Sequence, residues 1–303
     1  MLKRLFKKRK VGDSERAKIG AAWQSKITQT SPSSDPLVIF AIPLIGKRRA
    51  NDWNQVQRNL VRTIASIRNQ TSDRWVVYIC GQTRPERIEF DEKVRFVKFN
   101  KIKLPILEKG VFGYDQGDKR VMLIDTALRN HSGEDGYYAR WDGDDLVHPE
   151  AVAYIHSDNN GRGYLVERGI MADLDEGHFG QLGDPAIPNS KPFWRLCGSS
   201  SFVRFDFRSQ PKLWREQLMR HSSHKGLVKW MEASGLPLTP IPFDAAIYSY
   251  NNGENMSTRK GSGQRGKHIK DNQLMPDAVA QVRETFDLDR ILALSGRTSE
   301  VVS

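Results

Sequence analysis

The chain has 303 residues and a formal net charge of +11, and 38% of its residues are hydrophobic and 27% charged. This composition is typical of a soluble globular protein, and the longest apolar run, LVIFAIPLI at 37–45, is too short to cross a bilayer. Because there are two cysteines and no CxxC spacing, neither a disulfide framework nor a zinc site is indicated. The N-terminus also lacks the pattern of a secretory signal, so we expect a protein of the reducing cytoplasm.

The positive charge is concentrated at the N-terminus, where the first 18 residues contain eight Lys or Arg against two acids. Residues 1–34 are predicted to be a basic tail and linker. A solvated tail is one interpretation, and weak peripheral contact of residues 1–18 with the inner face of a membrane is a second. Nucleic acid is not expected as a partner, because the chain has no aromatic–basic recognition motif.

Residues 35–160 alternate between strand-like and helix-like patterns of apolar side chains. Val56, Leu60, Ile64 and Ile67, for example, recur at helical spacing. The predicted strands lie at 37–45, 74–81, 93–99 and 137–142, and the predicted helices at 53–69, 117–130 and 148–157. This order predicts an α/β fold with a mostly parallel central sheet, which binds ligands outside the carboxyl ends of its strands.

Residues 161–275 are less regular. We expect a hairpin or strand pair at 162–174, helices at 211–220 and 224–234, and a strand at 244–250. The C-terminal segment, 276–303, is predicted to begin with one closing helix over 276–294.

An acidic cluster follows the predicted strand at 137–142, in the stretch RWDGDDLVHPE. Asp142, Asp144 and Asp145 are close enough to repel one another unless a cation or hydrogen-bond donors compensate. Oxygen ligands suit Mg²⁺ or Mn²⁺, so a metal site at the end of a strand is one interpretation. The alternative is an acidic turn that caps the following helix.

The stretch WDGDDLVHPEAV resembles the metal-binding DxD region of GT-A glycosyltransferases, especially bacterial rhamnosyltransferases and related family-2-like enzymes. Weaker similarities follow in the same order. They are the stretches FAIPLIGKRRANDW and WVVYIC, the Asp118-Lys119-Arg120 helix start, CGSSSFVRF at 197–205, and NGENMST at 252–258. The resemblance covers about residues 36–260, and it is most specific at 137–150.

The resemblance implies a GT-A-like, Rossmann-related fold in which 35–160 bind a nucleotide-sugar donor and 161–275 bind the acceptor. It also implies Mn²⁺ or Mg²⁺ as cofactor, and transfer of a hexosyl-type sugar to a glycan or lipid-linked acceptor in bacterial cell-surface polysaccharide synthesis. Asp142 is expected on the sugar side, and Asp144 and Asp145 on the metal. Related sequences often carry a histidine where this chain has Asn252, so Asn252, His268 or water is expected to complete the metal site.

The remaining expected site residues are cations and a base. Lys119 and Arg120 match the place of a cation near the donor, although an ordinary charged helix start fits equally well. In the basic stretch 257–270, Arg259, Lys260 and Arg265 are expected to fold over the diphosphate, unless the stretch is only a surface loop. Asp244 is the first candidate for the base that deprotonates the acceptor, and the alternatives are Glu167, Asp173 and Asp175.

Two other classes of function stay open from the sequence. One is a non-catalytic module that binds carbohydrate or nucleotide. The other is a metal-dependent phosphoester hydrolase or nucleotidyltransferase, which would normally need more His and Asp ligands than this chain offers.

Overall fold

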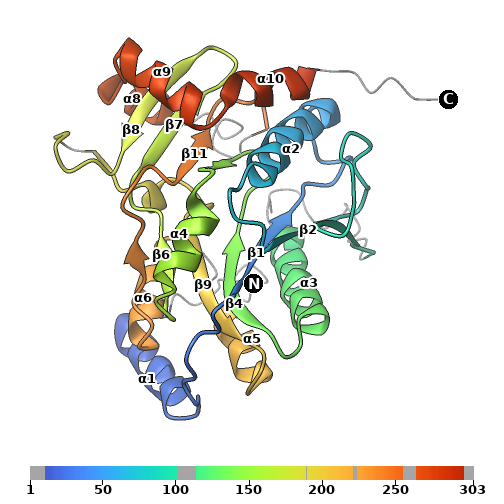
Figure 1. Cartoon of the computed structure of the whole chain (residues 1–303), viewed down its shortest axis with the longest axis vertical. Helices are drawn as coiled ribbons and strands as arrows, with labels where there is room; N and C mark the ends of the chain where they lie inside the picture. Colours follow the sequence, from blue (N-terminus) through green and yellow to red (C-terminus); the bar gives the residue numbers. More distant parts are fainter. Residues whose placement is uncertain (1–10, 101–113, 189, 221–223, 255–263, 297–303) are drawn as a thin grey trace, which may run out of the picture.

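The computed structural model describes residues 11–100, 114–188, 190–220, 224–254 and 264–296. Two sheets lie along the long axis of the molecule (Figure 1). A cluster formed by α1, α5 and α6 lies at one end of this axis, and the smaller sheet with α8, α9 and α10 lies at the other (Figure 1).

The large sheet has seven strands in the order β10-β6-β9-β4-β1-β2-β3. Its strands are β1 Leu37–Pro43, β2 Trp75–Gly81, β3 Val94–Lys98, β4 Asp135–Arg140, β6 Gly163–Leu165, β9 Ser201–Asp206 and β10 Thr239–Pro240. All neighbouring pairs are parallel except the two that β9 makes with β4 and β6. The predicted α/β class with a mostly parallel central sheet is therefore confirmed, and the arrangement is compatible with a Rossmann-like fold.

Helices cover both faces of this sheet, which explains why β1 is apolar along its whole length. Val38, Phe40 and Ile42 pack in one core with α2 Trp53–Arg68 and α4 Ala151–Asp158. The alternate residues of β1 pack in a second core with α3 Tyr114–Asn130, α5 Pro211–Met219 and α6 His224–Ala233.

The small sheet has the order β5-β11-β7-β8 and packs against the C-terminal helices. Its strands are β5 Leu146–Val147, β7 Gly169–Asp173, β8 His178–Leu182 and β11 Ala246–Ser249. The expected strand pair within 162–174 is not formed, because β6 and β7 belong to different sheets and β7 pairs with β8. A short 3-10 helix, η3 Phe193–Arg195, follows β8.

The C-terminal segment contains two helices where the sequence predicts one. After α8 Gln264–Asp271 come α9 Pro276–Thr285 and α10 Leu288–Gly296. Asp287, between them, has a φ of 52°, which lies in the left-handed region and ends the first helix. This turn lets α10 lie against α2, where Arg62 donates hydrogen bonds to Ser295 Oγ and Asp175.

The segment that the sequence sets apart as tail and linker is packed against the domain from residue 13 onward. The helix α1 Asp13–Gln24 contacts α6, and its Trp23 is 1% exposed. The Trp23 ring meets the edge of Trp214 with centroids 5.3 Å apart, and its Nε1 donates to the carbonyl of Leu213. Residues 1–10, which carry much of the basic charge, lie outside the described residues. In the described part of the chain, no helix has both the length and the apolar character needed to span a membrane.

Candidate functional site

The acidic cluster lies directly after β4, at the carboxyl edge of the large sheet. Trp141 fixes the start of this turn, because its backbone N–H donates to Ala41 and its indole Nε1 donates to the carbonyl of Asp145. Gly143 lies close to the apolar core, where a Cβ would come to 3.4 Å from Ile42 and Leu60. The turn is therefore held by buried groups on both sides of its three acids.

Asp145 is fully buried and accepts three hydrogen bonds. Ser199 Oγ and Cys197 Sγ donate to Oδ2 at 2.6 and 3.1 Å, and the backbone N–H of Ser249 donates to Oδ1 at 3.1 Å. Burial raises the pKa of Asp145 well above its ordinary value, and the neighbouring Asp144 and Asp142 raise it further. Both oxygens are thus engaged in joining the turn to β11 and to the segment before β9.

Asp144 has an enclosed carboxylate, although the residue as a whole is half-buried. Burial, and then the charge of Asp142, raise its pKa to about 7. The amide Nδ2 of Asn252 donates to Asp144 Oδ2 at 2.9 Å, and Asn252 Oδ1 accepts from the backbone N–H of Glu254. The structure therefore brings Asp144 and Asn252 together, and it turns the amide nitrogen of Asn252 toward the carboxylate.

Asp142 lies between Ser199, Gly198 and two arginines. Its backbone N–H donates to Ser199 Oγ at 2.8 Å, and a Cβ at position 198 would lie 2.7 Å from its Oδ2, so Gly198 makes room for the carboxylate. Burial lowers the pKa of both Arg120 and Arg140, and the charge of Asp142 opposes this in each case. The charge of Asp142 therefore acts on both arginines.

Lys119 is buried more deeply than expected for a side chain that binds a nucleotide-sugar donor. It is 1% exposed, and its Nζ donates to the carbonyl of Leu44 at 2.6 Å and to Asp115 Oδ2 at 3.0 Å. Burial lowers the pKa of Lys119, and Asp115 opposes this. Gln82 also donates to Asp115, so this polar group joins the ends of β1 and β2 to the start of α3.

Asp244 follows β10 at the same edge of the sheet, in the half expected to bind the acceptor. It accepts from Gln181 Nε2 at 2.7 Å and lies 3.6 Å from Arg168 Nε. Burial raises its pKa, and these two partners oppose the rise. The described contacts of Asp244 are with Gln181 and Arg168, and neither joins it to the acidic cluster.

The alternative bases have different surroundings. Asp173 accepts from Asn251 and from the backbone of Glu176, and Asp175 pairs with Arg62. Glu167 follows β6, and the backbone of its neighbour Val166 bonds to Ser200. Asp173 is thus bonded to the residue next to Asn252, whereas Glu167 follows a strand two positions from β4 in the sheet.

Of the other predicted site residues, His268 has a different described neighbour, and the side chains expected to bind the nucleotide-sugar donor are not described. His268 lies in α8, and its Nε2 is 3.2 Å from Lys191 Nζ. That helix packs on β8, which is three strand spacings from β5, about 14 Å. Arg259 and Lys260 lie outside the described residues, as does the side chain of Arg265 in α8.

The donor set fits a divalent cation that takes few protein ligands. The charge of Asp142 makes ionisation of the enclosed Asp144 more costly, which a cation would relieve, and the amide nitrogen of Asn252 holds the carboxylate of Asp144 in place. Mg²⁺ is commonly held by one or two carboxylates together with substrate phosphates. No group of three or more His, Cys, Asp or Glu side chains in the described ranges is arranged to hold a metal by itself.

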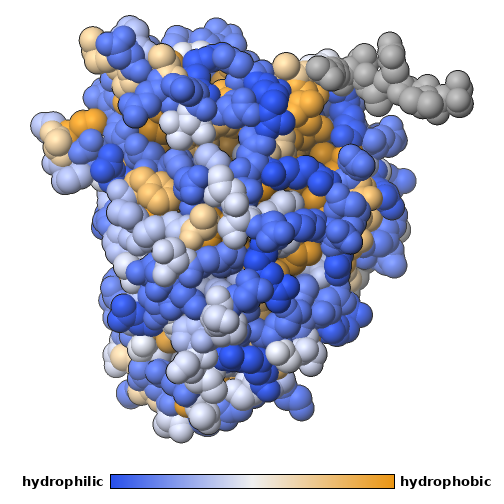
Figure 2. All heavy atoms as spheres, in the orientation of Figure 1, coloured by the Kyte–Doolittle hydropathy of each residue, from blue (hydrophilic) through white to orange (hydrophobic). Residues whose placement is uncertain are grey.

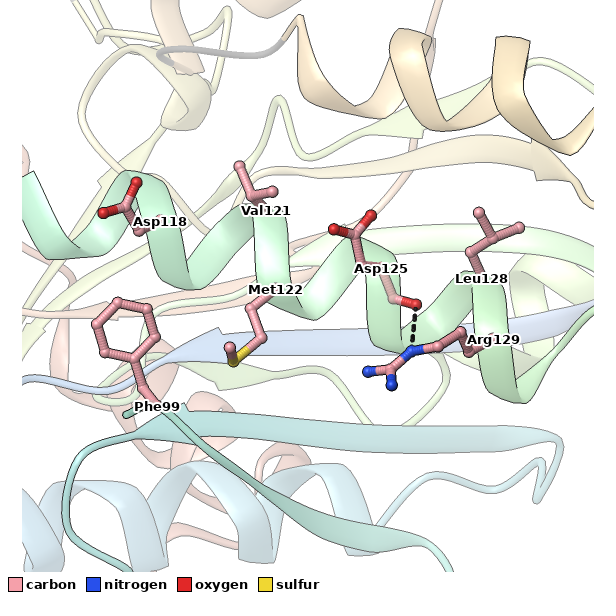
Figure 3. A pocket seen from close by; sticks show the side chains of 7 residues that line it. All are labelled: Phe99, Asp118, Val121, Met122, Asp125, Leu128 and Arg129. Atoms are coloured by element: carbon pink, nitrogen blue, oxygen red, sulfur yellow. Dashed lines mark hydrogen bonds between the residues drawn. The ribbon is translucent and has the colours of Figure 1, made fainter. Parts of the chain in front are cut away.

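A separate hollow of about 480 Å³ lies along α3, away from the acidic cluster. It is lined by Phe99, Asp118, Val121, Met122, Asp125, Leu128 and Arg129 (Figure 3). Phe99, at the end of β3, faces Met122 across the hollow, while Arg129 Nε bonds to the carbonyl of Asp125 (Figure 3). None of the acids at 142–145 lines this hollow.

Three residues near the acids were not singled out from the sequence. Ser199 and Gly198 lie in the CGSSSFVRF stretch, which the sequence marks only as a weak similarity to the family. Arg140 precedes Trp141, and its position as the last residue of a strand is the signal that could have placed it at the site.

No family model matches the chain, and no curated protein matches it.

Proposed function

We propose that this chain is a metal-dependent glycosyltransferase with a GT-A-like fold, which moves a sugar from a nucleotide-sugar donor to a glycan or lipid-linked acceptor. The observation that carries the proposal is the enclosed carboxylate of Asp144 next to the charge of Asp142, which also acts on Arg120, at the carboxyl end of β4. An α/β sheet of this kind presents its ligands at that edge. The resemblance of WDGDDLVHPEAV to a DxD region supports the same conclusion.

The acids have separate roles in this proposal. Asp144, with Asp142, would hold Mn²⁺ or Mg²⁺, which when bound neutralises charge on the donor diphosphate. Asp145 positions the turn through Ser199, Cys197 and Ser249. Asn252 orients the carboxylate of Asp144.

Transfer breaks the bond between the sugar anomeric carbon and the diphosphate oxygen, and forms a bond from that carbon to the acceptor oxygen. The acceptor hydroxyl loses a proton to a base, for which we propose Asp244, with Glu167 as the alternative. Burial raises the pKa of Asp244 and makes it a better proton acceptor. The nucleoside diphosphate leaves, and Arg120 stabilises its charge.

The first test measures binding and transfer across a panel of UDP-, GDP- and dTDP-sugars with Mn²⁺. We expect Asp144→Ala to weaken metal-dependent binding at least about tenfold and to keep or raise the thermal stability, because a buried like charge is removed. Asp145→Ala should instead lower the free energy of unfolding by about 2–4 kcal/mol, because three donors lose their acceptor.

Asp277→Ala is the matched control, since Asp277 is an exposed acid at the start of α9. It should bind nucleotide sugars as the wild type does. If the wild-type protein binds no nucleotide sugar in the panel with Mn²⁺, the transferase proposal is wrong.

A further inference from the structure

Asp244 and Gln181 meet where the two sheets join. Asp244 lies between β10 of the large sheet and β11 of the small sheet, and Gln181 lies in β8. The backbone of Gln181 is held on both sides, because it pairs with Ile170 of β7 and its N–H donates to the carbonyl of Asn272 at 2.8 Å. Gln181 is therefore attached to a fixed part of the fold, whereas Asp244 lies in a short connection between strands.

The side-chain amide of Gln181 is buried and faces three acceptors. The residue is 6% exposed, and its Nε2 lies 2.7 Å from Asp244 Oδ1 and 3.3 Å from the carbonyl oxygens of Gly169 and Leu182. Because each of these neighbours accepts hydrogen bonds, the amide nitrogen has to face them, and not the amide oxygen. The shortest of the three hydrogen bonds goes to the carboxylate.

The two described contacts of the Asp244 carboxylate are on the same oxygen. Gln181 Nε2 donates to Oδ1, and Arg168 Nε lies 3.6 Å from Oδ1, which is too far for a firm hydrogen bond. The side chain of Asp244 is 27% exposed, so the carboxylate is enclosed but still reached by solvent. Oδ1 is thus held by the fold, and Oδ2 has no partner among the described residues.

The charged groups around this carboxylate act in opposite directions. Burial raises the pKa of Asp244, the bond from Gln181 and the charge of Arg168 lower it, and the charge of Asp184 raises it. Arg168 is 41% exposed, so water screens part of its charge. Gln181 is therefore the buried one of the two groups that favour the ionised carboxylate.

We propose that Gln181 is the positioning residue of the acceptor base: its amide holds Oδ1 of Asp244, and Oδ2 is left to take the proton of the acceptor hydroxyl. This inference rests on the proposed function, because it concerns the base of that reaction. A carboxylate with one oxygen fixed no longer turns about its broad terminal torsion, so the lone pairs of the other oxygen keep one direction. An amide suits this task, because it donates a hydrogen bond without taking up a proton itself.

Water can take the place of the acceptor in the test. A water oxygen forms a bond to the anomeric carbon of the sugar, and the bond from that carbon to the diphosphate oxygen breaks. One proton of the water passes to Asp244 Oδ2, and the nucleoside diphosphate leaves with the bonding electron pair. Release of nucleoside diphosphate from the panel of UDP-, GDP- and dTDP-sugars with Mn²⁺ therefore measures the reaction without an identified acceptor.

The experiment compares Gln181→Met with the wild type, on the nucleotide sugar that the wild type hydrolyses fastest. Methionine is an unbranched side chain that adapts to its surroundings but donates no hydrogen bond. We expect kcat to fall at least about tenfold and the KM for the nucleotide sugar to change less than about twofold, because the base is misplaced while donor binding is kept.

The pH dependence gives a second readout of the same variant. Loss of the amide raises the pKa of Asp244, so the acid limb of the kcat/KM profile should move to higher pH in Gln181→Met. Gln281→Met, at an exposed position of α9, is the matched control and should keep the wild-type kcat and pH profile.

A double variant separates positioning from a purely structural role. Asp244→Asn keeps an oxygen for the Gln181 amide but removes the base, so kcat should fall about 100-fold or more. Adding Gln181→Met to Asp244→Asn should then lower kcat by less than about a further twofold, because no base is left to position. A structural role of Gln181 would instead lower kcat by the same factor in both backgrounds.

Thermal unfolding shows which variants keep the fold. If Gln181→Met does not fold, Gln181→Glu decides the case, because it keeps the shape, replaces the donor by a second carboxylate and should also move the acid limb to higher pH. The inference is overturned if the folded variant has the wild-type kcat and pH profile, or if its loss of kcat is the same with and without Asp244.

Failure of this inference can be told apart from failure of the proposed function. If the wild type neither binds nor hydrolyses any nucleotide sugar, the proposed function is wrong and the inference fails with it. If it binds one without releasing nucleoside diphosphate, donor binding stands and the inference is overturned. Hydrolysis that Asp244→Asn leaves unchanged upholds the transferase, overturns the inference and moves the role of base to Glu167.

Discussion

Three aspartates that are near neighbours in the sequence meet different surroundings in the fold. Asp145 receives three donors, Asp144 receives one amide, and Asp142 faces two arginines. The surroundings of Asp145 and Asp144 come from residues that lie more than 50 positions further along the chain, such as Ser199 and Asn252. For this reason the residues of the acidic turn alone predict an acidic site, and only the family resemblance assigns separate roles to its members.

The site residues that could be predicted are those whose signal is local. The DxD spacing after a strand places Asp142 and Asp144, and the helix start places Arg120. Ser199 could not be predicted, because its role depends on the antiparallel insertion of β9 next to β4. Lys119 was predicted as a site residue, but the structure shows that its ammonium group donates to the carbonyl of Leu44 and to Asp115.

His148 gives the molecule a pH dependence of stability. Burial lowers its pKa from 6.5 to about 4, and Glu150 opposes this. Between these values the unfolded chain binds a proton that the folded chain does not, so stability falls as the pH drops from 6.5 toward 4 and is unaffected by this group above 6.5.

Replacing His148 by Gln removes this titration and keeps an acceptor for the backbone N–H of Glu150, which now bonds to His148 Nδ1. We expect the loss of unfolding free energy between pH 7 and pH 5 to be about 1 kcal/mol smaller in the variant, allowing for partial exposure. Urea denaturation at both pH values measures it. His178→Gln, at an exposed histidine, should behave as wild type, and an unchanged loss in His148→Gln would contradict the prediction.

At the scale of elements, strands were easier to predict than the ends and junctions of helices. The apolar runs within 37–45 and 74–81 correspond to β1 and β2, because strands buried on both faces have a strong local signal. The division between α9 and α10 depends on the left-handed backbone conformation of Asp287, which an aspartate in the sequence does not by itself predict. The helix α1 is fixed by Trp23 against Trp214, a contact between distant parts of the chain.

The contact between α1 and α6 predicts that substitutions at two neighbouring positions of α1 have very different effects on stability. A Cβ at Gly20 would lie 2.1 Å from the carbonyl oxygen of Ala233, so Gly20→Leu should separate the helices and lower the free energy of unfolding by about 2–4 kcal/mol. Ala21 is exposed, and Ala21→Leu should change it by less than about 0.5 kcal/mol. Chemical denaturation compares the two, and equal effects would show that α1 does not depend on this contact.

At the scale of the whole molecule, the acidic site lies between a helical end and an end that contains the small sheet. The cluster of α1, α5 and α6 lies at one end, and the small sheet with α8 to α10 lies at the other (Figure 1). The face shown in Figure 2 is mostly hydrophilic, with apolar side chains in small groups. In the described ranges, Met219 and Met275 are the large hydrophobic residues that are exposed.

The basic N-terminus predicts salt-dependent binding to anionic membranes. Residues 1–10 contain six Lys or Arg, each worth about 1 kcal/mol near an anionic surface. We expect deletion of residues 1–10 to reduce binding to vesicles containing phosphatidylserine at least about tenfold at low salt, measured by flotation. Vesicles of phosphatidylcholine are the control. Equal binding by the full and shortened chains would favour the solvated-tail interpretation.

The carboxylate of Asp145 also has a consequence for the order in which the molecule is assembled. Its side-chain partners Cys197 and Ser199 come 52 and 54 residues later, and the backbone of Ser249 comes 104 residues later. During synthesis, the acidic turn therefore cannot reach its final shape until residue 249 has left the ribosome. Because such long-range closure is slow, we expect the site to be among the last parts of the domain to become ordered.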